Sequence, residues 1–286
     1  MIKRISFIFI LFGLNFVYAN SYHEERCYNG DYTSCALLGI YYAEQNNYET
    51  ATILLSKSCE NGIIRSCVDL GVIFAANQKY DEAKKLFEIG CNGDVVLGCT
   101  LLGLLYNDGL GVKKDYKQAF NLANKSCQGN VGYGCIVLAR FYYEGTGVEK
   151  NYQMSIESAI KACELGQTVA CVTLSNIYFN GNNVEKDYNQ AFKFANMACE
   201  RGDLQGCIII AYDYYKGLGV EVDYKQSFVM ANELCNQNIA LACRYIADMY
   251  HYGQGVGADQ DKAKFFIEKA CKLGEARACE ALKNIK

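Results

Sequence analysis

The sequence contains sixteen cysteines, and every one belongs to a pair whose members are eight positions apart. The first cysteine of successive pairs advances by 32 residues twice and then by 36 residues five times. The pairs are Cys27 and Cys35, Cys59 and Cys67, Cys91 and Cys99, Cys127 and Cys135, Cys163 and Cys171, Cys199 and Cys207, Cys235 and Cys243, and Cys271 and Cys279. A period of this size is typical of a repeat array, in which each repeat is one supersecondary unit. The spacing therefore constrains the architecture more than any single residue does.

The first nineteen residues have the pattern of a secretory signal peptide. Lys3 and Arg4 precede an apolar run over residues 5–17, and small residues at Val17 and Ala19 mark a cleavage site. The run is too short for a comfortable membrane span, and no later segment is apolar for long enough to cross a bilayer. We therefore predict cleavage near Ala19 and a secreted or periplasmic mature protein.

The charge balance excludes one class of partner. Without Lys3 and Arg4, the 28 basic residues fall to 26 against 31 acidic ones, which gives a net charge of −5. A nucleic-acid-binding protein would need a basic stripe. We therefore expect no nucleic-acid partner.

The residues around each cysteine pair predict two helices per repeat. The helix that opens at the second cysteine, called helix A, has an apolar, a small and an aromatic residue at fixed positions, as in Leu102, Gly103 and Tyr106. These positions are three, four and seven residues after the cysteine and share one helical face. We expect the small residue to let a neighbouring helix come close, and the aromatic ring to fill the core beside it.

A second helix, called helix B, runs into the first cysteine of the next pair. The position five before that cysteine is large and apolar in the other repeats, but it is serine at Ser158. Glycine-bearing turns such as residues 144–148 join the two helices, because glycine adopts the left-handed conformation that ends a helix. Each unit is thus an antiparallel helix hairpin, and it must stack on its neighbours to bury its apolar face.

The pattern divides the chain into four parts. These are a signal peptide over residues 1–19, an N-terminal cap over 20–34, seven helix-hairpin repeats over 35–274 and a C-terminal capping half-repeat over 275–286. In the half-repeat, Lys283 and Lys286 replace the small and aromatic residues of the other repeats. We expect these lysines to close the stack toward water.

Export and an even cysteine count predict disulfide bonds. The end of each helix B lies near two helix A starts, so local geometry allows a bridge to the next cysteine or to the one that opens its own hairpin. Pairing inside each hairpin would leave Cys27 and Cys279 unpaired at opposite ends of the array. We therefore predict eight bridges at a separation of eight. Zinc is not expected, because zinc sites prefer narrower cysteine spacings and the chain has only two histidines, His23 and His251.

Residues 102–119 read Leu-Gly-Leu-Leu-Tyr-Asn-Asp-Gly-Leu-Gly-Val-Lys-Lys-Asp-Tyr-Lys-Gln-Ala, which resembles the Sel1-like repeat, a relative of the tetratricopeptide repeat. With a cysteine pair in every repeat and a signal peptide, residues 27–279 resemble the Helicobacter cysteine-rich proteins. The resemblance implies an all-α protein, an α/α solenoid wound as a right-handed superhelix, with bridges at a separation of eight. It also implies a β-lactamase-like activity, penicillin binding or slow hydrolysis, but no motif transfers catalytic residues to this chain.

The residues themselves give little support to catalysis. The Ser-x-x-Lys pattern of serine β-lactam enzymes is matched by Ser158 and Lys161, without an accompanying Lys-Thr-Gly or Ser-Asp-Asn. Ser158 occupies a core position of helix B. His23 lies in the N-terminal cap, and His251 occupies a surface or groove position of helix A. Catalytic residues are therefore unknown, and no cofactor is predicted.

Binding has better support, because a variable stripe runs beside the fixed positions of helix A. The stripe includes the positions two and five after the second cysteine. At position five it reads Ile40, Val72, Leu104, Arg140, Asn176, Tyr212 and Asp248, and at position two Leu37, Asp69, Leu101, Val137, Thr173, Ile209 and Tyr245. Fixed scaffold positions beside a variable stripe suit an extended peptide or protein partner. The alternative is that the apolar early part of the stripe is only packing between helices.

We therefore interpret the chain as an exported, monomeric, disulfide-clamped scaffold. It is predicted to bind a peptide or protein in a concave groove through Arg140, Asn176, Tyr212, Tyr245 and Asp248. The alternative from another class is a β-lactamase-like enzyme, whose ligand would be a β-lactam or a cell-wall fragment.

Overall fold

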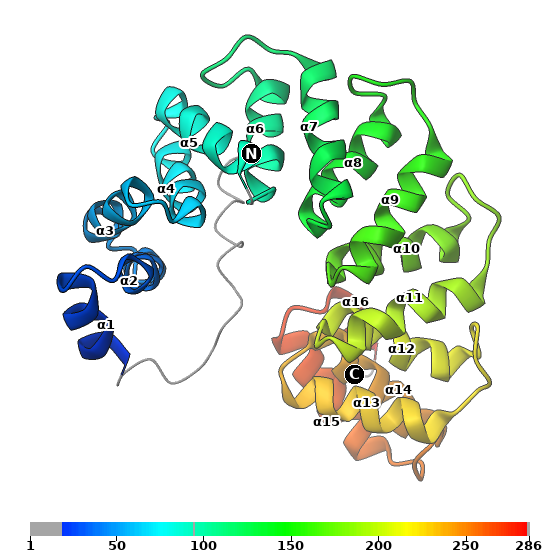
Figure 1. The fold of residues 1–286 in the computed structure, drawn as a ribbon. Coiled ribbons are helices and arrows are strands. Elements are labelled where there is room, and N and C mark those ends of the chain that lie inside the picture. Colours follow the sequence, from blue (N-terminus) through cyan, green and yellow to red (C-terminus); the bar gives the residue numbers. More distant parts are fainter. Residues whose placement is uncertain (1–18, 94, 285–286) are drawn as a thin grey trace. The chain divides into compact units, whose positions relative to one another are not determined.

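The computed structural model describes residues 19–93 and 95–284, which form sixteen helices and no strands (Figure 1). The predicted signal peptide falls on residues 1–18 and Ala19, so apart from Ala19 it lies outside the described residues and stays a prediction. The chain divides into two compact units, residues 1–158 and 159–286, and each is described by itself. The division falls inside α9 (Tyr152–Glu164).

The first unit consists of α1 to α8 and the start of α9. Its helices are α1 (Ala19–Tyr28), α2 (Tyr32–Glu44), α3 (Tyr48–Glu60), α4 (Ile64–Ala76), α5 (Tyr80–Asn92), α6 (Leu97–Asp108), α7 (Tyr116–Gln128) and α8 (Gly132–Glu144). Even-numbered helices are the predicted A helices, and odd-numbered ones are the B helices.

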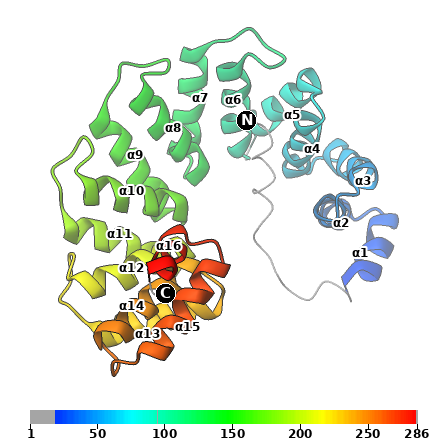
Figure 2. The same ribbon diagram turned by 180° about the vertical axis from the view of Figure 1, so that it is seen from behind.

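The second unit continues the same alternation (Figure 2). Its helices after α9 are α10 (Thr168–Asn180), α11 (Tyr188–Glu200), α12 (Leu204–Lys216), α13 (Tyr224–Asn236), α14 (Ala240–Tyr252), α15 (Gln260–Lys272) and α16 (Ala276–Asn284). In both units the all-α hairpin prediction is confirmed.

The predicted starts of the A helices are wrong by two or three residues. The second cysteine of each pair lies inside the first turn of its helix and does not open it. Helix α2 begins at Tyr32 rather than at Cys35, α4 begins at Ile64 rather than at Cys67, and α6 begins at Leu97 rather than at Cys99.

The reason for these earlier starts is the short B-to-A turn, which is complete before the cysteine. In α2 the turn residue Asp31 caps the helix. Its side chain accepts hydrogen bonds from the backbone N–H groups of Thr33 and Ser34, which satisfies donors at the helix start. In α4 the N–H of Ser66 already donates to the carbonyl of Ile63, one residue before Cys67. The helix therefore begins where its first donors find acceptors.

The small residue of helix A lets the two helices of a hairpin approach closely. A Cβ on Gly39 would lie 2.7 Å from Cγ of Leu55, and one on Gly71 would lie 2.7 Å from Cε1 of Phe87. Leu55 and Phe87 are themselves almost fully buried. The apolar side chain of helix B therefore fills the space that the glycine of helix A leaves open, as close packing of a core requires.

The motif between helices A and B is a helix stop followed by a helix cap. Gly145 ends α8 with φ of 78°, and its N–H donates to the carbonyl of Phe141. The residue that closes this turn, Asn151, caps the next helix by accepting a 3.0 Å hydrogen bond from the N–H of Met154, as Asp115 does for Gln118 in the preceding turn. The second glycine, Gly147, has φ of 69° and lies against the backbone of Tyr116 on the preceding helix B. The motif therefore joins successive repeats as well as turning the chain.

Alanine at Gly147 should destabilise the protein more than alanine at Gly145. Both residues have positive φ, which costs alanine roughly 1 kcal/mol or more. A Cβ on Gly147 would also overlap the carbonyl of Tyr116, whereas one on Gly145 would meet its nearest atom at 3.4 Å. Urea unfolding of Gly147→Ala beside the matched control Gly145→Ala measures the difference. Equal losses would contradict the close approach of Gly147 to Tyr116.

All eight predicted disulfides are present, and each joins the end of a helix B to the start of the next helix A. Their Cα–Cα distances lie between 4.4 and 4.8 Å, within the normal range for a disulfide. The pairing prediction is confirmed, and every repeat carries its own covalent clamp. The bonded pairs are Cys27 with Cys35, Cys59 with Cys67, Cys91 with Cys99, Cys127 with Cys135, Cys163 with Cys171, Cys199 with Cys207, Cys235 with Cys243 and Cys271 with Cys279.

Cations from the following repeat reach back to several of these clamps. Lys125 donates to the carbonyl of Cys91 at 2.9 Å, and Lys269 donates to that of Cys235 at the same distance. Arg201 donates to the carbonyl of Cys163 and lies 3.5 Å from the sulfur of Cys171. These contacts satisfy carbonyls at helix ends, where a positive charge is also favourable.

The core has one unusual member in α12. Asp213 is only 2% exposed, and its Oδ1 has no hydrogen-bond partner. It lies six positions after Cys207, where the other full repeats carry large apolar side chains. Those are Tyr41, Ile73, Leu105, Phe141, Ile177 and Met249. Burial raises the pKa of the Asp213 carboxyl from 3.8 to about 7.

Candidate functional site

In the first unit, half of the stripe positions two and five of the A helices are buried. Leu101 and Val137 are each 3% exposed, and Val72 is 8% exposed. Asp69 is also buried, and Arg65 neutralises it through a 3.0 Å ion pair. Leu37, in the first A helix, remains 40% exposed. The alternative interpretation, packing between helices, therefore accounts for much of this part of the stripe.

In the second unit, the same stripe is open to solvent and has a different chemistry. Thr173 and Asn176 are exposed on α10, and Tyr212 and Tyr245 are half-buried on α12 and α14. The side chain of Asp248, one turn after Tyr245, is 39% exposed. Apart from the half-buried Ile209, hydroxyl, amide, carboxylate and tyrosine side chains thus take the place of the buried aliphatic residues of the first unit.

The two tyrosines of this surface stack on each other. The ring centroids of Tyr212 and Tyr245 are 5.6 Å apart, with 29° between the ring planes. The guanidinium of Arg244 lies 5.1 Å from the centroid of the Tyr245 ring. Stacked rings and a cation over an aromatic face are each worth roughly 0.5–1 kcal/mol or more. These contacts hold side chains of two successive A helices in place.

Arg244 also forms ion pairs with two carboxylates. Its Nη1 lies 3.3 Å from Oδ2 of Asp248, and its Nε lies 3.6 Å from Oε2 of Glu275. Glu275 in turn accepts a hydrogen bond from the N–H of Ala278 at the start of α16. We call Tyr212, Arg244, Tyr245, Asp248 and Glu275 the tyrosine–arginine cluster. It connects α12, α14 and the residue that caps α16.

Burial dominates the electrostatics of the cluster. It raises the pKa of the Asp248 carboxyl, although Arg244, His251 and Lys216 oppose the shift. Burial also raises the pKa of Tyr245, while Arg244 and Arg277 lower it. The Tyr245 hydroxyl therefore stays protonated at neutral pH and can donate a hydrogen bond to a ligand.

The cluster includes three of the five predicted binding residues, Tyr212, Tyr245 and Asp248. Asn176 is exposed on α10 of the same unit. Arg140 lies on α8 in the first unit, where its guanidinium is 5.5 Å from the ring centroid of Phe141 and its Nε has no hydrogen-bond partner. All five residues remain predictions as a binding set.

Two members of the cluster were not predicted from the sequence. Arg244 immediately follows Cys243, at a position that is Ala, Val, Thr or Ile in the preceding repeats. That break in an apolar column was a detectable signal. Glu275 gave no comparable signal, because acidic residues at helix starts are common caps.

Ser158 is not arranged as a nucleophile. It is 6% exposed, and its hydroxyl donates a 2.7 Å hydrogen bond to the carbonyl of Met154 one turn earlier in α9. This is the usual back-bond of a helical serine. The core position predicted for Ser158 is confirmed, and nothing at this site favours β-lactam chemistry.

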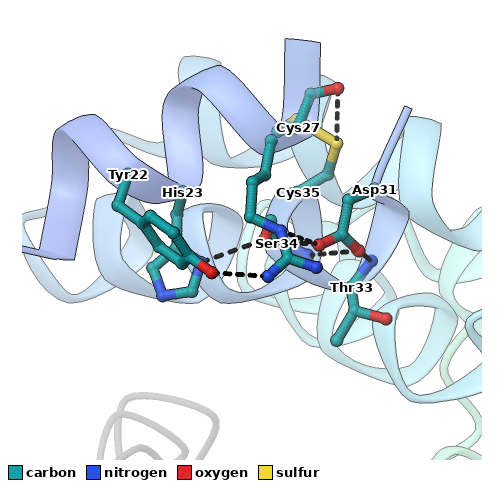
Figure 3. A network of polar contacts seen from close by, with 8 residues as sticks. Tyr22, His23, Cys27, Asp31, Thr33, Ser34 and Cys35 are labelled. Atoms are coloured by element: carbon teal, nitrogen blue, oxygen red, sulfur yellow. Dashed lines mark hydrogen bonds and ion pairs between the residues drawn. A yellow bond between two sulfur atoms is a disulfide. The ribbon is translucent and has the colours of Figure 1, made fainter. Parts of the chain in front are cut away.

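His23 lies beside a serine and an aspartate, but their connection differs from that of a catalytic triad. His23 Nδ1 is 3.0 Å from Ser34 Oγ, and Ser34 Oγ donates to Asp31 at 2.9 Å (Figure 3). In a triad the histidine lies between the serine and the acid, whereas here the serine lies in the middle. Ser34 is 3% exposed, and Asp31 is the cap of α2 and pairs with Arg26 at 2.8 Å. The network is a helix cap.

His251 contacts a glutamine side chain of the next helix instead of a nucleophile. Its Nδ1 lies 2.7 Å from Oε1 of Gln260, at the start of α15. Among residues 19–93 and 95–284, no group of three or more His, Cys, Asp or Glu side chains is placed to hold a metal ion.

A separate hollow lies in the second unit, at the turns that follow α10 and α12. Tyr178, Lys186 and Tyr188 line it together with Gly219 of the next turn. The hollow is wide open to solvent and contains none of the predicted site residues. The tyrosine–arginine cluster is therefore the better candidate site.

Similarity to two solved structures, with TM-scores of 0.71 and 0.66, supports the helical repeat fold. The chain is 22% identical to a protective antigen of uropathogenic Escherichia coli with an SLR fold, over 93% of this chain and 58% of the antigen, with a TM-score of 0.71. It is 24% identical to a Sel1 repeat protein from Oxalobacter formigenes, over 75% of this chain and 88% of that one, with a TM-score of 0.66. It is also 28% identical to the cysteine-rich protein B of Helicobacter pylori, over 59% of this chain and 96% of that one, with a TM-score of 0.28.

No curated protein sequence matches this chain. Within the described part of the chain, none of the helices has the length and apolar character needed to span a membrane.

The Sel1 repeat model matches six segments, which together cover well over half of the chain. The segments are residues 34–63, 96–131, 132–167, 168–203, 205–238 and 240–275. This chain belongs to the Sel1 repeat family.

Proposed function

We infer that this protein is an exported scaffold that binds a peptide or protein partner on the A-helix surface of its second unit. One observation carries the proposal. Stripe positions two and five are buried in much of the first unit, whereas none of them is fully buried in the second. There the stripe carries stacked tyrosines and a carboxylate, with Arg244 beside them. Tyrosine and arginine dominate the binding energy of many protein interfaces. Sel1 repeats generally mediate contacts between proteins, which agrees with this assignment.

Two further observations support an extracytoplasmic setting. Eight disulfides and the absence of free cysteines among the described residues suit an oxidising compartment. The signal-peptide pattern at the N-terminus points to the same compartment. A rigid covalent clamp in every repeat also suits a binding surface, because pre-organised side chains lose less entropy when a partner binds.

Selection of phage-displayed peptides on the oxidised protein tests the proposal. Selected peptides should bind Tyr212→Ala/Tyr245→Ala at least about tenfold more weakly, since each ring would remove roughly 1 kcal/mol of contact. The matched control is Val229→Ala/Phe265→Ala, which removes two apolar side chains that are 51% and 61% exposed on the B helices.

The control should bind the selected peptides as tightly as the unaltered protein. Alanine at Asn176, which is exposed on α10 of the same unit, should weaken binding further. Peptides that bind the tyrosine variant without loss would contradict the placement of the site. A selection that yields no specific peptide would contradict the function itself.

A further inference from the structure

The charge around the tyrosine–arginine cluster has the opposite sign to that of the whole chain. The full sequence carries 28 basic and 31 acidic residues, a net charge of −3. Lys216 and Arg277 act electrostatically on Asp248 and on Tyr245, respectively. Together with Arg244 they make three cations near two anions, Asp248 and Glu275. The local balance is therefore positive on an acidic protein.

The three cations are not equally free to meet a ligand. Arg244 is 19% exposed, and both of its ion pairs are with the carboxylates of the cluster. Lys216 and Arg277 are exposed, and neither has an ion pair with any carboxylate of the described residues. The ammonium of Lys216 lies 4.7 Å from the centroid of the Tyr215 ring. The positive surplus thus lies on the two side chains that a partner can reach.

The tyrosines supply the remaining chemistry of the surface. Their half-buried rings offer flat apolar contact, and the Tyr245 hydroxyl, whose pKa burial raises, stays a donor. Tyrosine, lysine and arginine all donate hydrogen bonds that a carboxylate accepts. An acidic side chain could therefore be held by charge and by hydroxyl donors while its neighbours contact the rings.

We propose that the tyrosine–arginine cluster recognises an acidic peptide segment, whose carboxylates meet Lys216 and Arg277 while its chain lies over Tyr212 and Tyr245. This proposal rests on the proposed function and names the chemistry of the partner. A basic segment would meet the positive surplus and would have to displace Arg244 from the carboxylates. A nucleic acid is disfavoured because two exposed cations are far fewer than a phosphate-binding stripe provides.

The test uses the oxidised full chain and a short fluorescein-labelled peptide in which glutamate alternates with alanine. Matched peptides carry glutamine or lysine in place of glutamate. Fluorescence anisotropy should rank the affinities as glutamate, then glutamine, then lysine. Two exposed ion pairs predict a difference of roughly tenfold between glutamate and glutamine. The affinity for the glutamate peptide should fall as salt is added, because exposed charges are screened.

Charge-reversal variants locate the effect. Lys216→Glu/Arg277→Glu should weaken binding of the glutamate peptide by at least about tenfold and should reverse the preference between the glutamate and lysine peptides. Lys225→Glu/Lys264→Glu is the matched control, because both lysines are exposed in the same unit and the charge change is identical. The control should lose less than about twofold.

Several outcomes would overturn the proposal. Equal affinity for the glutamate and glutamine peptides would remove the charge preference. An equal loss in both charge-reversal variants would show an effect of net charge alone. A single-stranded oligonucleotide of equal charge that binds as tightly would show general affinity for polyanions. If selected peptides depend on Tyr212 and Tyr245 but are neutral or basic, the acidic assignment fails and the proposed function stands.

Discussion

Replacing the internal pair Cys127 and Cys135 by alanine should lower the free energy of unfolding by about 2.5 kcal/mol or more. The bridge closes a nine-residue loop, and the chain-entropy estimate for such a loop is about that size. The two cysteines are 4% and 0% exposed, so losing the sulfur atoms also removes packing from a dense core. Chemical unfolding of the oxidised variant beside the unaltered protein measures the change.

The terminal pair provides the matched control. Cys271→Ala/Cys279→Ala removes the same kind of bridge, but α16 is the last helix of the described chain and both cysteines are only half-buried. We expect local opening of α16, seen as faster amide hydrogen exchange in residues 276–284, with a smaller change in global stability. An equal loss of global stability in both double variants would show that the contribution of a bridge does not depend on how deeply it is buried.

The repeat architecture could be predicted because its determinants recur at fixed spacing. Eight cysteine pairs and the small residue of each helix A repeat the same pattern along the chain. The disulfide pairing followed from counting, because pairing inside each hairpin would leave two cysteines unpaired. The contact between Gly39 and Leu55 follows from that pattern. The helix starts were less predictable, since they depend on caps such as Asp31, which need not lie at the cysteine.

The candidate site was predictable only in outline. The variable stripe predicted Tyr212 and Tyr245, because side chains at stripe positions of successive A helices contact each other. It could not separate exposed positions from buried ones. Leu101 and Tyr245 lie at the same repeat position, yet only Leu101 is fully covered by its neighbours. The ion pair between Arg244 and Glu275 joins α14 to α16 and depends on how the two helices approach each other. Burial and approach are tertiary properties that one repeat does not encode.

Stability of this protein should decrease as the pH rises from about 5 to about 8, and Asp213 should cause much of that decrease. The Asp213 carboxyl is buried without a hydrogen-bond partner for Oδ1, and burial raises its pKa from 3.8 to about 7. An acid with a raised pKa binds its proton more tightly in the folded state than in the unfolded chain. Its contribution to stability is therefore present at low pH and is lost as the pH rises through 7.

The size of the effect follows from the shift. At about 1.4 kcal/mol for each pKa unit, the contribution between pH 5 and pH 8 changes by roughly 2 to 3 kcal/mol. Asp213→Asn is the direct test, because asparagine has nearly the same shape and does not ionise. Unfolding free energies at both pH values should show a decrease in the unaltered protein that is larger than in the variant by that amount.

Asp213→Met provides a second variant, since Met249 holds the equivalent position of α14 with no exposed surface. It should be more stable than the unaltered protein at pH 8, because no buried charge forms on folding. Glu221→Gln, at an exposed position of the same unit, is the control and should keep the full pH dependence. If Asp213→Asn retained the pH dependence as well, the carboxyl would be ionised in the folded protein at little cost. Other groups of α12 or of its neighbouring helices would then stabilise the ionised carboxylate of Asp213.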